Sequence, residues 1–230
     1  IISSEHTTKE LMRLYSPDVT ATLENGYITI CSERVLPVDS IYLKESYNVK
    51  NFMSAIALST GLTDKEAILS LARDFRGLPH RKELVRQYDG ISYVNSSIDS
   101  TPERTAKTLS SLNARAVVIV GGAKKGLSYA PLIRALSECA RAVVLTGEST
   151  DELLEILFGI DGFGVEIYAE HDFDASIELA ARIARGGETV ILSPAHTSYD
   201  RFANFEQRGE KFKEIIKKII DSRQNGAKRK

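Results

Sequence analysis

Residues 193–209 read SPAHTSYDRFANFEQRG, and they follow the short apolar run TVIL at residues 189–192. The apolar run is typical of a buried strand, and the segment Phe202–Ile220 has the spacing of an amphipathic helix. In an open α/β sheet, a loop between a strand and a helix lies beyond the carboxyl ends of the strands, where anionic ligands bind. The stretch therefore predicts an α/β fold with a ligand site at this edge.

The loop itself is rich in hydroxyl groups, which are carried by Thr197, Ser198 and Tyr199. We expect Asp200 to act as the N-cap of the helix that follows. The same spacing also fits an ordinary capped loop without a ligand, so the residue types alone leave both interpretations open.

Strands and helices alternate from residue 82 to residue 225. This alternation predicts βαβ units and a Rossmann-like, mostly parallel sheet with helices on both faces. Asp89-Gly90 predicts a hairpin between the first two strands. The expected strands are 83–88, 91–95, 117–120, 142–145, 165–168 and 190–192, and the expected helices are 102–112, 129–139, 150–157, 173–185 and 202–220.

The first 76 residues have a different pattern. Alternating runs at 19–23 and 27–31 flank Asn25-Gly26, which is a strong hairpin signal. Two helices are expected after residue 46, the second of them capped by Thr63 or Asp64, and a helical turn or loop is expected over residues 7–14. We place a domain boundary at Gly77-Leu78-Pro79 and expect a solvated tail at residues 226–230.

Composition narrows the functional classes. The formal net charge is −1, so nothing in it favours nucleic acid or an anionic membrane surface as a partner. No apolar run approaches the roughly 20 residues of a membrane span. Cys31 and Cys139 lie in apolar stretches and are expected to be reduced thiols in or near a core. We expect a cytoplasmic monomer.

Two further loops are expected at the edge where residues 193–200 lie. Residues 95–104, NSSIDSTPER, follow one strand, and residues 121–125, GGAKK, follow another. Paired glycines let a ligand approach the backbone, and a lysine beyond them can meet an anion. The first loop fits equally well a polar loop with Ser100 or Thr101 as N-cap and Pro102 at the first helical position. Together the loops suit a small dicarboxylate.

The order of residues in SPAxxSxDxFxNFExRG resembles the C-terminal signature of the Mur ligases, specifically those that add D-glutamate. Other segments of the chain resemble the same family. They are YNVKN at 47–51 (with Tyr47 where the family has His), GLPHR at 77–81, SSIDS at 96–100, and Gly121-Gly122 with Lys125. The resemblance implies an ATP-dependent, amide-forming ligase that joins D-glutamate to UDP-N-acetylmuramoyl-L-alanine in cytoplasmic peptidoglycan synthesis.

The resemblance also implies roles for particular residues. The D-glutamate carboxylates would be held by Ser100, Lys125, Ser198 and the backbone around Tyr199 and Phe205. ATP would be bound by Asn48 and Asn51 at the adenine end and by Arg81 at the phosphates. The ribose-binding aspartate of the family corresponds to Ser96 here, and Asp99 is a candidate to replace it. No catalytic residue is assigned within these segments.

The family's phosphate loop and its Mg²⁺ ligands have no counterpart in these residues. Residues 1–76 therefore resemble the last part of the central ATP-binding domain, and residues 77–225 the Rossmann-like amino-acid-binding domain. On this basis we expect the chain to be the C-terminal portion of a ligase and to be inactive alone. Two alternatives stay open: a stand-alone, non-catalytic module that binds a dicarboxylate or nucleotide, and a different ligase of the same superfamily.

Overall fold

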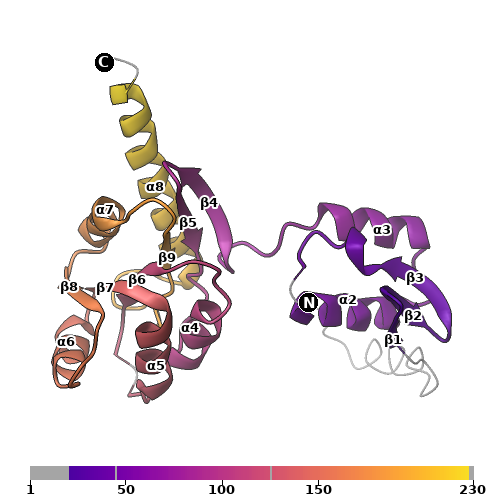
Figure 1. Ribbon diagram of the computed structural model, residues 1–230, viewed down its shortest axis with the longest axis horizontal. Helices are drawn as coiled ribbons and strands as arrows, with labels where there is room; N and C mark the ends of the chain where they lie inside the picture. The colour runs from indigo at the N-terminus through magenta and orange to yellow at the C-terminus, as the bar shows by residue number, and fades with distance from the viewer. Residues whose placement is uncertain (1–20, 45, 125, 228–230) are drawn as a thin grey trace. The chain divides into compact units, whose positions relative to one another are not determined.

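The computed structural model describes residues 21–44, 46–124 and 126–227. The chain divides into two compact units, residues 1–77 and 78–230, which are described separately below (Figure 1). The expected strand start at residues 19–20 and the expected turn at residues 7–14 lie outside the described residues, as does Lys125.

The first unit is a three-stranded antiparallel sheet with two helices. Its strands β1 (Ala21–Glu24), β2 (Tyr27–Ile30) and β3 (Glu33–Pro37) lie in that order. Helices α2 (Ser46–Ser59) and α3 (Lys65–Asp74) follow a short 3-10 turn, Val38–Ser40. Asp64 caps α3 by accepting a hydrogen bond from the N–H of Ala67. The core joins sheet and helices through Ile28, Ile30, Leu36, Ile41, Val49, Phe52, Ile56 and Ala72.

The second unit contains a six-stranded sheet in the order β4-β5-β9-β6-β7-β8. Only the pairing of β4 with β5 is antiparallel. The strands are β4 (Glu83–Tyr88), β5 (Ile91–Asn95), β6 (Ala116–Gly121), β7 (Ala140–Thr146), β8 (Glu166–Ala169) and β9 (Thr189–Leu192). The last strand, β9, lies between β5 and β6 and is parallel to both. The carboxyl ends of these three strands therefore lie at the same edge of the sheet.

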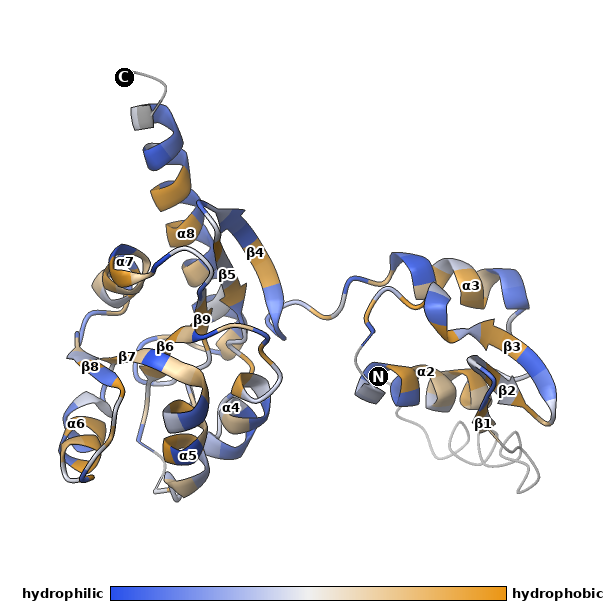
Figure 2. Cartoon of the chain, in the orientation of Figure 1, coloured by the Kyte–Doolittle hydropathy of each residue, from blue (hydrophilic) through white to orange (hydrophobic). Residues whose placement is uncertain are grey.

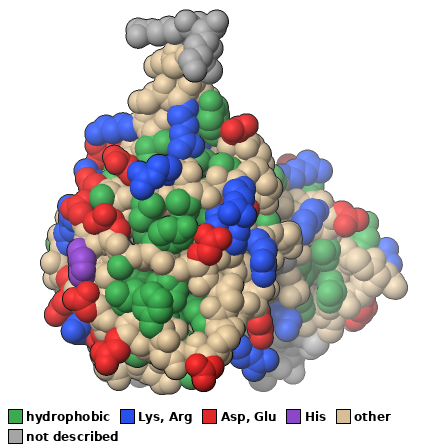
Figure 3. Space-filling model, turned by 60° about the vertical axis from the view of Figure 1, so that its left-hand side comes forward, with side chains coloured by type: hydrophobic (Ala, Val, Ile, Leu, Met, Phe, Trp, Pro, Cys, Tyr) green, Lys and Arg blue, Asp and Glu red, His purple; other side chains and the backbone are tan. Residues whose placement is uncertain are grey.

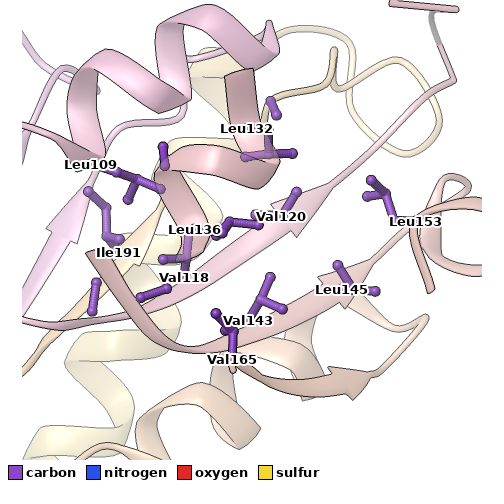
Figure 4. Close-up of a cluster of buried hydrophobic side chains, with 14 of the residues drawn as sticks. Leu109, Val118, Val120, Leu132, Leu136, Val143, Leu145, Leu153, Val165 and Ile191 are labelled. Carbon is purple, nitrogen blue, oxygen red and sulfur yellow. The ribbon is translucent and has the colours of Figure 1, made fainter. Parts of the chain in front are cut away.

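Helices cover both faces of this sheet. One core lies under α4 (Pro102–Leu109), α5 (Ala130–Cys139) and α6 (Thr150–Phe158). Figure 4 shows Leu132 and Leu136 of α5 with Val118 and Val120 of β6 in this core. The other core lies under α7 (Phe173–Ile183) and α8 (Phe205–Ala227). Hydrophobic and hydrophilic residues alternate along α8, as expected of a helix with one buried face (Figure 2).

The predicted fold class is confirmed, with three local corrections. Asp200 does not cap the last helix: α8 begins at Phe205, and Asn204 accepts a hydrogen bond from the N–H of Gln207. The helix also continues to Ala227, two residues into the predicted tail. Cys31 is exposed rather than near the core, because it lies in the turn between β2 and β3, whereas Cys139 is half-buried.

Among the described residues, no helix is long and apolar enough to cross a membrane. Lysine and arginine side chains are interspersed with aspartate and glutamate on the face that Figure 3 presents. This distribution agrees with the small net charge of the chain and offers no single-sign patch on that face.

Candidate functional site

Three loops leave the carboxyl ends of β5, β9 and β6 and contact one another. The Oγ of Ser193 donates a hydrogen bond to the Oδ2 of Asp99, at 2.8 Å, which joins the β9 loop to the β5 loop. The N–H of Gly121 donates to the carbonyl of Pro194, at 2.9 Å, which joins the β6 loop to the β9 loop. The predicted convergence of the three loops is therefore observed in the backbone and in buried side chains.

Arg208, on the first turn of α8, connects these loops. Its Nε donates to the Oγ of Ser97, and its Nη2 donates to the carbonyls of Ser97 and His196 at 2.9 and 3.0 Å. Its partners are therefore neutral oxygens from the β5 and β9 loops. The side chain is 2% exposed, so it acts as a buried crosslink rather than a surface charge.

The charge of Arg208 is poorly compensated. Burial lowers the pKa of its guanidinium to about 10, although the nearby carboxylates of Asp200 and Asp99 act in the opposite direction. Its Nη1 has no hydrogen-bond partner among the described residues. Arg208 lines a cavity of about 20 Å³ together with Gly122, Gly147 and Asp200, a volume that would hold a single water molecule.

The paired glycines are required for close backbone packing. Gly121 and Gly122 have φ of +138° and +142°, a conformation that other residues rarely adopt. A Cβ on Gly121 would collide with the backbone of Thr146, and one on Gly122 would collide with the carbonyl of Thr197. These glycines therefore let the β6 loop lie directly against its neighbours, which is a structural reason for the GG pair independent of a ligand.

His196 is buried next to the predicted ligand-binding Ser198. Its Nε2 lies 2.9 Å from the hydroxyl of Tyr129, and its Nδ1 lies 3.0 Å from the carbonyl of Pro194. Burial lowers the pKa of the imidazole, and burial raises the pKa of the Tyr129 hydroxyl to about 12. Ala195, which directly precedes His196, has φ of +60° and is 1% exposed.

The predicted residues of the β5 loop differ in accessibility. Ser96 is fully buried, and its Oγ accepts from the N–H of Lys82 at 3.3 Å. Asp99 is 5% exposed and is engaged by Ser193. Ser100 is half-buried. Thr101, and not Ser100, is the N-cap of α4. Ser96 and Asp99 thus have structural partners, and their proposed part in ribose binding stays a prediction.

The predicted residues after β9 are arranged along one turn. Ser198 is buried, and its carbonyl accepts from the N–H groups of Arg201 and Phe202. Tyr199 is 73% exposed. The carbonyl of Phe205 accepts from the Oγ of Ser97 at 2.8 Å, and its ring packs edge-on against His80. The backbone of Phe205 is therefore fixed to the β5 loop.

The predicted ATP-binding residues belong to both units. In the second, Arg81 is exposed on a tight turn between His80 and Lys82, both of which have positive φ. In the first, Asn48 is half-buried and Asn51 is exposed, one turn apart on α2. This spacing places both amides on one side of the helix. Within the described residues, no group of three His, Cys, Asp or Glu side chains could hold a metal ion.

The sequence alone does not indicate that Arg208, His196 and Tyr129 form hydrogen bonds between these loops. Arg208 was part of the matched motif, and its position three residues after Phe205 was the available signal for a side chain on the same helical face. His196 is a single histidine with no ligand spacing around it, and its partner Tyr129 is 67 residues away.

The fold and the loops define a Rossmann-like α/β domain with a polar, buried crosslink at the carboxyl edge of its sheet. Residues 80–196 match the family model described as Mur ligase, glutamate ligase domain. The chain therefore belongs to the Mur ligase family.

Two curated relatives show to which enzymes of this family the chain is similar. The UDP-N-acetylmuramoylalanine–D-glutamate ligase of Clostridium novyi is 34% identical over 202 residues, which are 86% of this chain and 44% of that protein. The enzyme of that name from Cupriavidus pinatubonensis is 34% identical over 197 residues, covering 85% of this chain and 39% of that protein. The chain thus spans less than half the length of the curated relatives it matches.

Solved structures show the same fold at lower identity. UDP-N-acetylmuramate–alanine ligase from Thermotoga maritima has a TM-score of 0.59 at 19% identity, covering 83% of this chain and 42% of its own. A murein peptide ligase from Psychrobacter arcticus has a TM-score of 0.55 at 14% identity, covering 86% of this chain and 44% of its own.

Proposed function

We propose that the protein carrying this chain joins D-glutamate to UDP-N-acetylmuramoyl-L-alanine in an ATP-dependent reaction, and that residues 77–225 bind the amino acid. One observation carries the proposal. The loops with Ser198 and the Phe205 backbone are joined through Arg208 and Ser97, in a chain 34% identical to a ligase named for D-glutamate.

The chemistry needs an amino acid that is held by its carboxylates. The L-alanine carboxylate takes the terminal phosphoryl group of ATP, and the glutamate amine then attacks the acyl carbon. An amide bond forms, the carbon–oxygen bond to phosphate breaks, and the amine loses a proton. The hydroxyls of Ser100 and Ser198, the cation of Lys125 and backbone N–H groups near Tyr199 and Phe205 are suitable donors for two carboxylates. Such positioning can contribute about 7–11 kcal/mol at most to lowering the barrier.

We propose that Asn48 and Asn51 contact the adenine end of ATP and that Arg81 contacts its phosphates. Amide groups suit the edge of a base, and an exposed guanidinium suits a phosphate. The described residues do not fit a Mg²⁺ site, so no step is assigned to a metal held by them. Ser96 and Asp99 are the two candidates at the ribose.

We also propose the organisation of the protein around this chain. Residues 1–76 would be the last part of the central ATP-binding domain, which agrees with the division of the chain after Gly77. The protein would act as a monomer in the cytoplasm, where the nucleotide-linked precursor is made. A non-catalytic binding module is less well supported, because curated relatives at 30–34% identity are ligases by name.

The test is an assay of ADP formation by the full protein with UDP-N-acetylmuramoyl-L-alanine and D-glutamate. Ser198→Ala should raise the KM for D-glutamate by about 10- to 100-fold, the usual effect of losing one hydrogen bond to a charged group. Ser137→Ala is the matched control, because Ser137 is exposed on α5 and bonds only its own helix.

The proposal fails if ADP formation does not depend on D-glutamate, or if another amino acid replaces it equally well. An unchanged KM in Ser198→Ala would remove Ser198 from the site while leaving the reaction itself supported.

A further inference from the structure

Tyr129 and His196 form a buried pair behind the loop that carries Ser198. Tyr129 is 8% exposed and His196 is 1% exposed. Their rings lie 5.4 Å apart, centroid to centroid, and are tilted by 35°. Tyr129 directly precedes α5, whereas His196 follows β9, so the pair ties two separate connections of the sheet together.

The hydrogen bonds of His196 define its tautomer. The carbonyl of Pro194 can only accept, so Nδ1 of His196 carries the proton in that bond. In the neutral ring, Nε2 is then an acceptor, and the Tyr129 hydroxyl donates to it. This arrangement leaves no polar atom of the imidazole unpaired.

Three of the four residues from 194 to 197 accept a hydrogen bond through their carbonyl groups. Pro194 accepts from the N–H of Gly121, and the carbonyl of His196 accepts from Arg208. The carbonyl of Thr197 accepts from the N–H of Ala123 at 3.0 Å. Ala195 is held at positive φ, which costs about 1–2 kcal/mol for a residue with a Cβ. The buried His196 side chain adds two contacts to this turn, one with the Pro194 carbonyl and one with the Tyr129 hydroxyl.

We propose that Tyr129 and His196 are positioning residues for Ser198, holding the 194–197 turn in the conformation that presents the Ser198 hydroxyl to the amino-acid substrate. This inference rests on the proposed function, because it assigns the pair to the D-glutamate site. Neither residue touches the substrate in this scheme; both act through the backbone that leads to Ser198.

Charged groups on several elements face the pair. The carboxylate of Glu152 on α6 lies close enough to raise the pKa of the Tyr129 hydroxyl, and it is paired with Lys124. The charges of Arg208 and Asp200 act on His196. The Tyr129 hydroxyl has one proton and two acceptors nearby, His196 and Glu152. Because the His196 ring is neutral with its proton on Nδ1, the hydroxyl proton points to Nε2 in the positioning state.

The experiment combines kinetics of the full protein with NMR of the imidazole nitrogens. Tyr129→Phe should raise the KM for D-glutamate about tenfold, while the KM for ATP and kcat stay within about threefold of wild type. Tyr168→Phe is the matched control: it also removes a hydroxyl, which bonds Glu166 on β8 away from these loops. In wild type, the nitrogen shifts should show a neutral His196 protonated on Nδ1.

Two results would overturn the inference: a His196 protonated on Nε2 at neutral pH, or a Tyr129→Phe protein whose KM for D-glutamate equals that of Tyr168→Phe. A wild type without any D-glutamate-dependent activity would instead refute the proposed function. In that case the positioning role of Tyr129 and His196 is tested by the backbone amide chemical shifts of residues 195–198. Shifts that change in Tyr129→Phe but not in Tyr168→Phe support the role, and shifts that stay unchanged in both variants reject it.

Discussion

Arg208 is buried and Arg141 is half-buried, and they lie at opposite edges of the same sheet. At the amino ends, Arg141 donates to both oxygens of Glu188, to Glu166 and to the carbonyl of Ile183. At the carboxyl ends, Arg208 donates only to neutral oxygens and leaves Nη1 without a partner among the described residues. The hydrogen bonds that Arg141 donates to Glu188 raise the pKa of its guanidinium, whereas burial lowers that of Arg208 to about 10.

The two networks differ in how they compensate the charge of the arginine. A bidentate pair such as Arg141–Glu188 satisfies both charges and holds α7, β7 and the start of β9 together. Arg208 retains a poorly compensated charge where the loops that follow β5, β9 and β6 meet. Buried polar groups left partly unsatisfied cost stability, and they are found where function requires a particular geometry.

The largest effect should come from Arg141→Met. This substitution leaves the Glu188 carboxylate, whose side chain is only 11% exposed, without its cationic partner. We therefore expect the free energy of unfolding to fall by about 2–4 kcal/mol. Urea unfolding with an unchanged m-value measures the loss. The double variant Arg141→Met with Glu188→Gln should recover part of it, because the stranded charge is then absent.

Arg208→Met provides the comparison at the other end. It removes a poorly compensated cation and leaves one hydroxyl and two carbonyl acceptors, so we expect a smaller loss of about 1–2 kcal/mol. The KM for D-glutamate should nevertheless rise in Arg208→Met and stay unchanged in Arg141→Met. A loss in Arg208→Met as large as that in Arg141→Met would contradict the distinction between the two networks.

The groups at the two edges of the sheet should also lose their contributions to stability in different pH ranges. His196 has a folded pKa below 6.5 because it is buried, so the unfolded state binds a proton first as the pH falls. Its contribution to stability is complete above pH 6.5 and is lost as the pH falls through the folded pKa. The slope of unfolding free energy is at most about 1.4 kcal/mol per pH unit for one proton.

Glu188 acts at lower pH. Burial raises the pKa of its carboxyl, but the Arg141 guanidinium and the N–H of Arg185 outweigh burial, so the pKa lies below 4.5. Its contribution is present above pH 4.5 and is lost as the pH falls through the folded value. In urea unfolding from pH 8 to pH 3, the dependence of stability on pH should become weaker below pH 6.5 in His196→Gln and weaker below pH 4.5 in Glu188→Gln. Glu83 and Asp172 also have lowered pKa values, so part of the acid dependence should remain in Glu188→Gln. Identical pH profiles in the two variants would refute this assignment.

The fold could be predicted largely from the sequence, because its signals are local. Short β-branched runs such as Val117–Val120 and Val190–Leu192 lie within the observed β6 and β9, and Asp89-Gly90 joins β4 to β5 as expected. The meeting of the three loops followed from the order of strands and helices, since parallel strands end at one edge. Cys31 shows the limit of the sequence analysis: it directly follows the apolar Ile30, but it lies in an exposed turn and is followed by Ser32 and Glu33.

The crosslinks in the site could not be predicted in the same way. Arg208 bonds Ser97, which is 111 residues away, and Tyr129 bonds His196 across 67 residues. No local periodicity encodes such pairs, and burial alone determines that Arg208 is a crosslink and not a surface charge. The sequence makes Asp99 a candidate for ribose binding, but it does not indicate the hydrogen bond that Asp99 accepts from Ser193, which is 94 residues away.

The start of α8 gives the smallest expected effect, and it tests the cap that sequence reasoning assigned to Asp200. Asn204 accepts from the N–H of Gln207 at 2.8 Å, and the side chain of Gln207 accepts from the N–H of Ala203. Asn204→Ala should therefore cost about 1 kcal/mol of unfolding free energy, as expected for the loss of an N-cap. Asp200→Ala should cost less, because its bond to the N–H of Glu148 is exposed and 3.3 Å long. The reverse order in urea unfolding would contradict the assignment of Asn204 as the cap that stabilises the start of α8.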